Sequence, residues 1–437
     1  MESREAWIQL NRESEEALFV PSGMLRVQPT DELGALERET LANMERDGFR
    51  ETQFVKSDEK DRNRASSLGW YHKLLNFQIP EKEDQKCFDA VLDTLGGFTN
   101  CSAACFFYHK LAVSLGVNFV FGRQEGRVLR FVEEPSSIDE ARKKVVGLRT
   151  KDGKTHAADV VVVAAGSFST QLLPCLSYHI ESSAGSTVIF KVDPSNKALW
   201  DKYSPENFPV ITWKSAARDK DGKDMGSIYV FPRTEHGLIK IGYRGIKVFR
   251  SFISATQVMA DRAALRKFTN FEKAPEGVPF TQDGQWSVPL PYHDCKAVPP
   301  RAREAIRTFV SIFLPEFANE AFHTTKLCWY TDTLDNSFLI DYVPQYAENS
   351  VFVCTGGSGH GAKFLPVLGQ VRQRAPQIHV EEHSRLLLQH AADIFENLND
   401  AKSHMREHWK WRDSAPRRNG LEEGPDGPRN IGNGSMN

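Results

Sequence analysis

One segment limits the possible folds of this chain more than any other, the stretch from Ser350 to Pro366. An apolar run at 350–354 leads into Thr-Gly-Gly-Ser-Gly-His-Gly, and the residues that follow can begin a helix. A strand, a glycine turn and a helix in this order are typical of α/β folds, where the turn presents backbone N–H groups and the positive end of a helix dipole to a ligand. The segment predicts a site for a flat, electron-rich and partly anionic group.

The same turn also satisfies a dinucleotide-binding fingerprint. Gly357, Gly359 and Ala362 have the spacing G-x-G-x-x-A, and Glu381 follows about twenty residues on, where an acid that binds ribose is expected. In a Rossmann unit the fingerprint precedes a second parallel strand, whereas arginine-rich polar sequence follows here. An NAD-dependent dehydrogenase is therefore one alternative interpretation.

A second strong signal is the β-branched run from Asp159 to Gly166. It predicts a fully buried strand, and the ending Ala164-Ala165-Gly166 would let a ligand approach the backbone at the carboxyl edge of a parallel sheet. A core strand with a tight exit explains the same residues equally well. Because a strand pattern at 144–150 and a turn at 151–154 precede the run, we predict a hairpin between 144–150 and 159–166.

The remaining periodicity predicts two interleaved domains. Alternating strands dominate residues 185–292 and indicate a second, antiparallel sheet. The other expected elements are helices over 2–17, 30–47, 101–115 and 302–314, a buried strand over 116–122, and strands at 328–333 and 338–341 before the glycine turn.

The composition excludes several classes of protein. Lys and Arg total 55 against 57 Asp and Glu, so there is no basic field for nucleic acid and no polybasic membrane signal. Apolar runs are short and the N-terminus is polar, which favours an intracellular protein; Ser435-Met436-Asn437 is not the usual peroxisomal tripeptide, and cytoplasm and peroxisome both remain open. Seven scattered cysteines without C-x-x-C spacing argue against a disulfide framework or a structural zinc site.

Three motifs together resemble one known family. The runs Cys-Trp-Tyr-Thr-Asp-Thr-Leu-Asp at 328–335, Phe-Leu-Ile-Asp at 338–341 and Gly-Gly-Ser-Gly-His-Gly-Ala-Lys-Phe-Leu-Pro at 356–366 are similar to those of the FAD-dependent amine oxidases of the monomeric sarcosine oxidase family, particularly the fungal fructosyl-amino-acid, saccharopine and pipecolate oxidases. The similarity extends over residues 3–412.

The resemblance implies an α/β (α+β) fold in which a truncated Rossmann-like FAD-binding domain interleaves with an antiparallel-sheet substrate domain. The corresponding divisions are a mixed segment at 1–86, part of the FAD-binding domain at 87–180, the substrate-binding domain at 181–300, a return to the FAD-binding domain at 301–412, and a tail at 413–437 whose composition predicts disorder.

The resemblance also assigns roles to single residues. Cys328 matches the cysteine that forms a thioether to the flavin 8α-methyl group, a reaction for which a thiolate is a suitable nucleophile. Lys240 matches the lysine over the flavin face that promotes reaction with dioxygen, because a fixed ammonium stabilises negative charge developing there. A structural cysteine and a lysine that faces water are the alternatives.

Lys363 matches a lysine that binds the substrate carboxylate, while Tyr330 and His360 match positions close to flavin and substrate, where either could equally serve packing. The residues that the resemblance places against the cofactor are Cys328, Gly357, Ser358, Gly359, His360, Gly361, Lys363, Ala164, Ala165 and Gly166 at the flavin, with Val128 near the adenine.

The chain departs from the family pattern in two places. The family begins with a strand, a G-x-G-x-x-G turn and a helix that hold the FAD pyrophosphate, and none of these is found, so we expect exposed apolar edges and weaker FAD binding. Residues 371–389 resemble a stretch inserted into the helix after the glycine turn. Both features are compatible with an incorrectly bounded gene or with a degenerate paralogue.

The family resemblance predicts a monomeric oxidase of a secondary-amine amino acid, of the sarcosine, pipecolate, saccharopine or fructosyl amino acid type. Its partners would be that small molecule and dioxygen, and its products an imine and hydrogen peroxide. A catalytically inactive, truncated relative is the second alternative. Such a protein would bind its ligand without oxidising it.

Overall fold

The computed structural model describes residues 1–28, 30–77, 79–81, 84–86, 88–213, 226–245, 270–273, 285–289, 296–333, 335–368 and 409–412. The insertion predicted at 371–389, the tail from 413 and Glu381 lie outside these residues. Among the helices that are described, none is long and apolar enough to cross a membrane.

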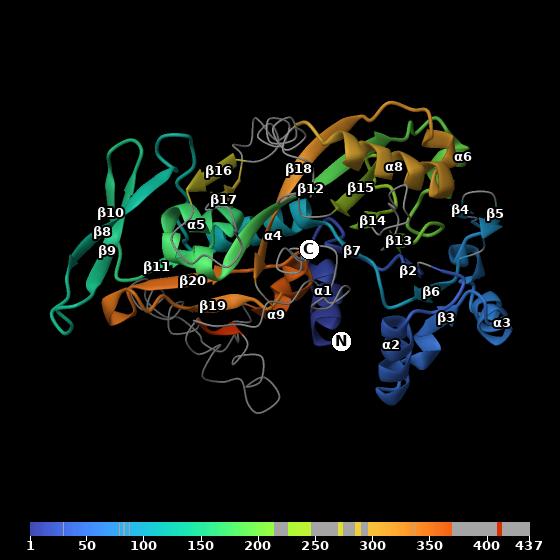
Figure 1. Ribbon diagram of the computed structural model, residues 1–437, viewed down its shortest axis with the longest axis horizontal. Coiled ribbons are helices and arrows are strands. Elements are labelled where there is room, and N and C mark those ends of the chain that lie inside the picture. Colours follow the sequence, from blue (N-terminus) through green and yellow to red (C-terminus); the bar gives the residue numbers. More distant parts are fainter. Residues whose placement is uncertain are drawn as a thin grey trace, which may run out of the picture.

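The largest sheet has eight strands, in the order β18-β12-β15-β14-β13-β2-β6-β3 (Figure 1). The strands are β2 (Met24–Val27), β3 (Gln53–Val55), β6 (Ala90–Asp93), β12 (Ile180–Lys191), β13 (Val210–Trp213), β14 (Gly226–Val230), β15 (Leu238–Gly245) and β18 (Thr324–Thr333). All neighbouring pairs are antiparallel except β13 with β2. The antiparallel sheet expected within 185–292 is confirmed, and strands from both flanking regions extend it.

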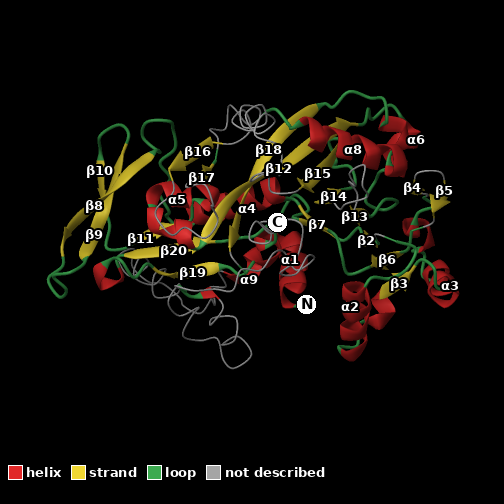
Figure 2. Ribbon diagram, viewed as in Figure 1, coloured by secondary structure: helices red, strands yellow, loops and turns green. Residues whose placement is uncertain are grey.

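One face of this sheet forms the main core. Every second residue along a strand is fully buried there, for example Ile239 and Ile241 of β15. Helix α8 (Pro300–Phe313) covers this face and contributes Ile306, Phe309, Val310 and Phe313 (Figure 2). Burial of each such side chain stabilises the fold by about 1.5–3 kcal/mol. Pro300 begins the helix and Pro315 follows its end, which explains why these bounds match the predicted 302–314 closely.

A second, smaller sheet has the order β11-β20-β19, with β11 (Val161–Val163), β19 (Leu339–Tyr342) and β20 (Val351–Thr355). β11 pairs in parallel with β20, nearly two hundred residues away in the sequence, so the predicted hairpin between 144–150 and 159–166 is wrong. Strand β9 (Lys143–Thr150) instead pairs with β10 (Thr155–Ala157) and β8 (Val128–Pro135). The predicted turn at 151–154 is present and joins β9 to β10, a strand of only three residues.

The first helix brings the N-terminal region to the glycine turn. Helix α1 (Glu2–Glu13) buries Trp7, whose Nε1–H donates to the Lys363 carbonyl oxygen at 3.1 Å. That carbonyl belongs to the short helical turn η8 (Gly361–Phe364), which continues into α9 (Leu365–Leu368). The helix expected after the glycine turn is described only as far as Leu368.

The other elements surround these layers. They are helices α2 (Ala35–Arg46), α3 (Glu59–Ser67), α4 (Cys101–Ser114), α5 (Ser169–Leu172) and α6 (Lys197–Lys202), the short helical turns η1 (Arg50–Thr52), η2 (Tyr71–Leu74), η3 (Gly166–Phe168), η4 (Pro174–Tyr178), η6 (Pro315–Phe317) and η7 (Ala347–Asn349), and the two-stranded pairs β1 (Phe19–Val20) with β7 (Phe98–Thr99), β4 (Ile79–Glu81) with β5 (Asp84–Lys86) and β16 (Asn270–Lys273) with β17 (Gln285–Val288).

Apolar side chains are exposed along α4, the segment after it and β11. Residues 116–122 form no strand and are exposed, so the buried strand predicted there is wrong. Val162, in the middle of β11, is 49% exposed because its side chain points to the opposite face of the sheet from the buried Val161 and Val163, which also corrects the prediction of full burial. The exposed apolar side chains here include Phe106, Val113, Leu115, Phe119, Val120, Phe121 and Val162, and Phe168 of η3 is exposed as well.

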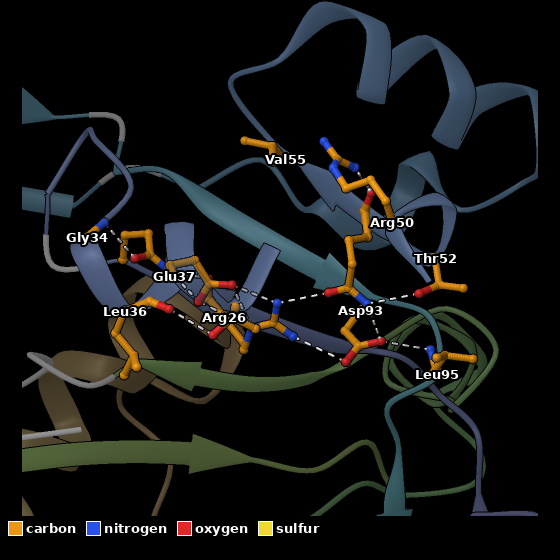
Figure 3. Close-up of polar contacts among 12 residues, drawn as sticks. Arg26, Gly34, Leu36, Glu37, Arg50, Thr52, Val55, Asp93 and Leu95 are labelled. Carbon is orange, nitrogen blue, oxygen red and sulfur yellow. Dashed lines mark hydrogen bonds and ion pairs between the residues drawn. The ribbon is translucent and has the colours of Figure 1, made fainter. Parts of the chain in front are cut away.

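A buried ion network joins α2 to strands β2, β6 and β3 at one end of the large sheet (Figure 3). Arg26 on β2 donates to Glu37 of α2 at 2.7 Å, to Asp93 of β6 at 3.2 Å and to Gln53 of β3 at 2.9 Å. Only 8% of Glu37 is exposed. The arginine therefore neutralises a carboxylate that has little access to water.

We expect Arg26→Met to lower the free energy of unfolding by about 3–5 kcal/mol, because the Glu37 carboxylate would stay buried without its cation. Urea unfolding followed by circular dichroism measures the change. Arg46→Met is the matched control, since its pair with Asp47 is exposed, and it should cost less than about 1 kcal/mol. Equal losses in the two variants would contradict the prediction.

Lys73 predicts a pH dependence of stability. Its ammonium is buried and donates to the carbonyl oxygens of Ser22 (2.8 Å) and Pro205 (2.7 Å). Burial lowers the pKa of Lys73 from 10.5 to about 8, and Glu206 opposes this in part. Between these pH values the unfolded chain binds more protons than the folded protein, so this group makes folding more favourable as the pH rises.

From pH 8 to 10.5 the native protein should therefore gain about 3 kcal/mol relative to Lys73→Met, measured as the difference between their unfolding free energies. Lys197→Met, which removes an exposed lysine, is the control and should follow the native protein. A constant difference between native protein and Lys73→Met would refute the assignment.

Candidate functional site

Strand register places several predicted site residues on the face of the large sheet opposite the core. Cys328 of β18 pairs with Gly185 of β12, and Lys240 of β15 pairs with Ile189 of β12. Paired residues share a face and every second residue returns to it. We call this surface the site face; it comprises Ser183, Gly185, Thr187, Tyr229, Lys240, Gly242, Arg244, Cys328, Tyr330 and Asp332.

Two glycines make room for two tyrosine rings on the site face. A Cβ at Gly185 would lie 2.4 Å from Cε2 of Tyr330, and one at Gly242 would lie 2.1 Å from Cζ of Tyr229. The two hydroxyl oxygens are 3.2 Å apart, so one hydroxyl donates to the other. Burial raises the pKa of both phenols, which keeps them neutral near pH 7. The pair adds an uncharged aromatic surface to the site face, on which Cys328 also lies.

Cys328 is half-buried and accepts a hydrogen bond from Thr187 Oγ1, at 3.4 Å from Sγ. The other cysteines of the described part of the chain lie elsewhere, on α4 (Cys101, Cys105), η4 (Cys175) and β20 (Cys354). Cys328 is the thiol that the fold places on the site face.

The glycine turn lies directly against this face. The Ser358 N–H donates to the Thr331 carbonyl at 2.9 Å, and Ser358 Oγ accepts from the Thr333 N–H at 3.2 Å. A Cβ at Gly359 would lie 2.8 Å from Nη1 of Arg244 and 3.4 Å from Cδ1 of Tyr330, and the φ angle of Gly359 is +77°. Glycine is required at this position both for space and for conformation.

Arg244 and Asp332 form an ion pair beside the turn that sequence reasoning missed. Arg244 Nη2 donates to Asp332 Oδ1 at 2.7 Å, and its guanidinium lies 5.1 Å from the centre of the Tyr330 ring. Asp332 is fully buried and also accepts from Ser183 Oγ at 2.6 Å. Both residues could have been predicted from the alternation of side chains along a strand. Each lies four positions after a predicted site residue, Lys240 or Cys328, and therefore on the same face.

His360 and Lys363 follow the turn. The His360 ring stacks on Phe338 with 5.2 Å between ring centres, and its Nδ1 lies 3.1 Å from the Ser358 carbonyl oxygen. Lys363 Nζ lies 5.1 Å from the centre of the Phe364 ring, and burial lowers the pKa of this lysine. Among the described residues no carboxylate pairs with the Lys363 ammonium, so this cation is available to an anion.

Lys240 lies on the site face but farther along it. It is offset from Cys328 by four residues of β12, roughly 13 Å along the strand direction. Its Nζ is 5.7 Å from the centre of the Phe231 ring. Burial raises the pKa of Cys101 at the start of α4, and the Lys240 ammonium opposes this rise, which places that helix start near the lysine.

The predicted residues near β11 lie at the edge of the smaller sheet, and Val128 lies in another sheet. Ala164, Ala165 and Gly166 follow β11 and are exposed, and a Cβ at Gly166 would lie 3.8 Å from Thr331 Oγ1 on β18. Val128, half-buried, begins β8 in the separate β8-β9-β10 sheet, which Figure 1 shows at one end of the molecule. The structure thus brings Ala164–Gly166 close to the site strands and leaves Val128 outside the group.

A cavity of about 700 Å³ lies at the opposite end of the large sheet, lined by residues that include Lys56, Arg62, His72 and Asp89. It shares no residue with the site face. The pocket and the predicted chemistry therefore belong to different parts of the molecule.

Solved structures share this fold. A modified fructosyl peptide oxidase from Aspergillus nidulans aligns with a TM-score of 0.63 at 20% identity over 94% of this chain and 79% of its own. The fructosamine oxidase Amadoriase II from Aspergillus fumigatus aligns with a TM-score of 0.60, over 94% of this chain and 75% of its own. The fold is that of these α/β oxidoreductases.

Curated relatives extend the comparison to sequence. L-saccharopine oxidase of Schizosaccharomyces pombe is 28% identical over 74% of this chain, which spans only 60% of that protein. Monomeric sarcosine oxidase of a Bacillus species is 24% identical over 88% of this chain and 78% of its own. Residues 1–372 match the FAD dependent oxidoreductase family, and the chain belongs to that family.

The residues present fit the family's cofactor, FAD. Three buried hydroxyls have no hydrogen-bond partner among the described residues: Thr355 Oγ1 at the carboxyl end of β20, and Ser169 Oγ and Thr170 Oγ1 in α5, just after β11. In open α/β sheets ligands bind outside the carboxyl ends of parallel strands. The glycine turn, the neutral tyrosine pair and the lysines add a flat surface and positive charge, the features that an anionic flavin nucleotide requires.

Proposed function

We propose that this protein, with FAD bound, oxidises a secondary-amine amino acid with dioxygen to an imine and hydrogen peroxide. One observation carries the proposal: a thiol, a neutral tyrosine pair and Lys240 share one sheet face, against which the glycine turn is packed, and the Lys363 ammonium that follows the turn pairs with no carboxylate of the described residues. Family membership favours FAD over the nicotinamide of the alternative dehydrogenase. The relatives named after saccharopine, sarcosine and fructosyl peptides support the amine class.

Lys363 would bind the substrate carboxylate. The Lys363 side chain is exposed, yet partial loss of water around its ammonium lowers the pKa, and an arriving anion would stabilise the charged form. Tyr330 would pack against the substrate, since its ring lies between Gly185 and the glycine turn. Together the two residues would orient the amine nitrogen.

Bound FAD would supply the hydride acceptor and the path by which electrons reach dioxygen. Lys240 would hold a fixed positive charge where negative charge develops on dioxygen, a preorganised electrostatic effect. Cys328 would tether the cofactor, and Gly357, Ser358, Gly359, His360, Gly361 and Ala164–Gly166 would line its site, with the more distant Val128 near the adenine.

The test combines flavin content with peroxide release. The purified protein, supplied with FAD, is scored for yellow colour that survives acid denaturation and for peroxide formed from N-methylglycine, pipecolate, saccharopine and a fructosyl amino acid. Peroxide from one of these supports the proposal and names the substrate, and a monomer is expected by gel filtration. Bound FAD without peroxide from any amine would favour an inactive binding protein, and failure to bind FAD would overturn the proposal.

A further inference from the structure

The contacts of His360 favour one position for its ring hydrogen. Nδ1 lies 3.1 Å from the Ser358 carbonyl oxygen, which can only accept, so a hydrogen bond between them requires the hydrogen on Nδ1. Burial lowers the pKa of His360, as do the cations Lys363 and Arg244, against the opposing effects of the Ser358 hydrogen bond and Asp332. The ring is therefore neutral at pH 7, and its Nε2 is an acceptor.

The ion pair of Arg244 with Asp332 also reaches the Ser358 carbonyl. Arg244 Nη1 is 3.5 Å from the Ser358 oxygen, while Nη2 is bound to the fully buried Asp332 at 2.7 Å. Ser183 Oγ occupies the second oxygen of Asp332 at 2.6 Å. The guanidinium also lies against Gly359, where any side chain would collide with it. Arg244 is thus held by Asp332 of β18, which is itself bound by Ser183 of β12, in addition to its contact with the turn.

We propose that Asp332 and Arg244 are positioning residues: through the Ser358 carbonyl they fix His360 in the tautomer with hydrogen on Nδ1. The unprotonated Nε2 then accepts a hydrogen bond from the N–H of the amine substrate. Only this last step rests on the proposed function. Among the described residues Nε2 has no hydrogen-bond partner, which leaves it free for that contact.

Proton–nitrogen correlation spectra of protein with ¹⁵N-labelled histidine test the proposal without cofactor or turnover. His360→Gln identifies the signal. We expect the native ring to carry its hydrogen on Nδ1. Asp332→Asn and Arg244→Met should shift the ratio of the two tautomers about fivefold toward Nε2–H, since one hydrogen bond of ordinary strength is weakened. Arg244→Lys keeps the charge without the two-point geometry and should give a smaller shift in the same direction.

Arg50→Met is the matched control. It breaks a comparable ion pair, the one with the buried Asp61 of α3 (2.9 Å), which lies away from the site face. It should leave the His360 tautomer unchanged. A native ring with hydrogen on Nε2 would overturn the proposal even if no variant folds, and so would an unchanged tautomer in Asp332→Asn and Arg244→Met.

Titration with N-methylglycine separates this proposal from the proposed function. A change in the Nε2 chemical shift with Nδ1–H retained supports both. If the tautomer and its response to the variants are as expected but no secondary amine moves Nε2, the positioning by Asp332 and Arg244 stands and the contact with an amine is refuted.

Discussion

Replacing Lys240 by Met should slow the reaction of the reduced, FAD-loaded protein with dioxygen by about 10²–10³-fold, the effect of removing one preorganised charge from a developing anion. Lys240 is fixed in the middle of β15 on the site face, and no carboxylate among the described residues neutralises it. Methionine keeps most of the length and the apolar stem while removing the charge. Stopped-flow mixing of the reduced protein with oxygenated buffer measures the step directly.

The reduction of the protein by its amine substrate should change less, because the negative charge gained by a flavin would be spread over its large ring system, whereas the charge on dioxygen would be confined to two atoms. Lys191→Met is the matched control. Lys191 ends β12 on the same side of the sheet and is exposed, so its loss should alter the oxygen step less than about twofold. An unchanged oxygen step in Lys240→Met would assign this lysine a purely structural role.

Cys328→Ser should abolish covalent flavin entirely. In the proposed link a thioether would replace the S–H bond of Cys328 and one C–H bond of the flavin 8α-methyl group, and dioxygen would accept the two electrons released. A serine hydroxyl is almost never ionised near pH 7, so it cannot replace the thiolate in this reaction. The colour of the acid-precipitated protein and its mass by spectrometry measure the result.

Cys354→Ser provides the comparison, because this thiol lies on β20 away from the site face, and burial raises its pKa. It should retain the covalent flavin. Covalent flavin that persists in Cys328→Ser would assign the bond to another residue, whereas flavin that is bound but never covalent in the native protein would remove the tether and leave the oxidase proposal intact.

Parts of the site could be predicted from the sequence because they depend on local chemistry. The apolar run and glycines at 350–361 require a strand and a tight turn, and both are present. The alternation within 238–245 and 324–333 decides which residues of each strand share a face, whatever its neighbours. Lys240 is thus grouped with Arg244, and Cys328 with Tyr330 and Asp332, by strand geometry alone.

Local pattern failed where the outcome depended on a distant partner. Residues 159–166 have the composition of a buried strand next to a good turn, and only the pairing of β11 with β20 reveals that they form no hairpin and leave Val162 exposed. Residues 116–122 have strand-like composition but no described strand pairs with them, so their backbone stays irregular.

The sequence by itself determined the family, the glycine turn and the residues of each strand that lie on a common face, because short-range sterics and side-chain alternation are encoded locally. Only the tertiary structure decided that β12 lies between β15 and β18 and so brings their polar residues together. It also decided that Arg244 meets Asp332 and the carbonyl of Ser358. Such contacts arise from register between segments almost a hundred residues apart, and register is fixed by the burial of the whole sheet and not by any single segment.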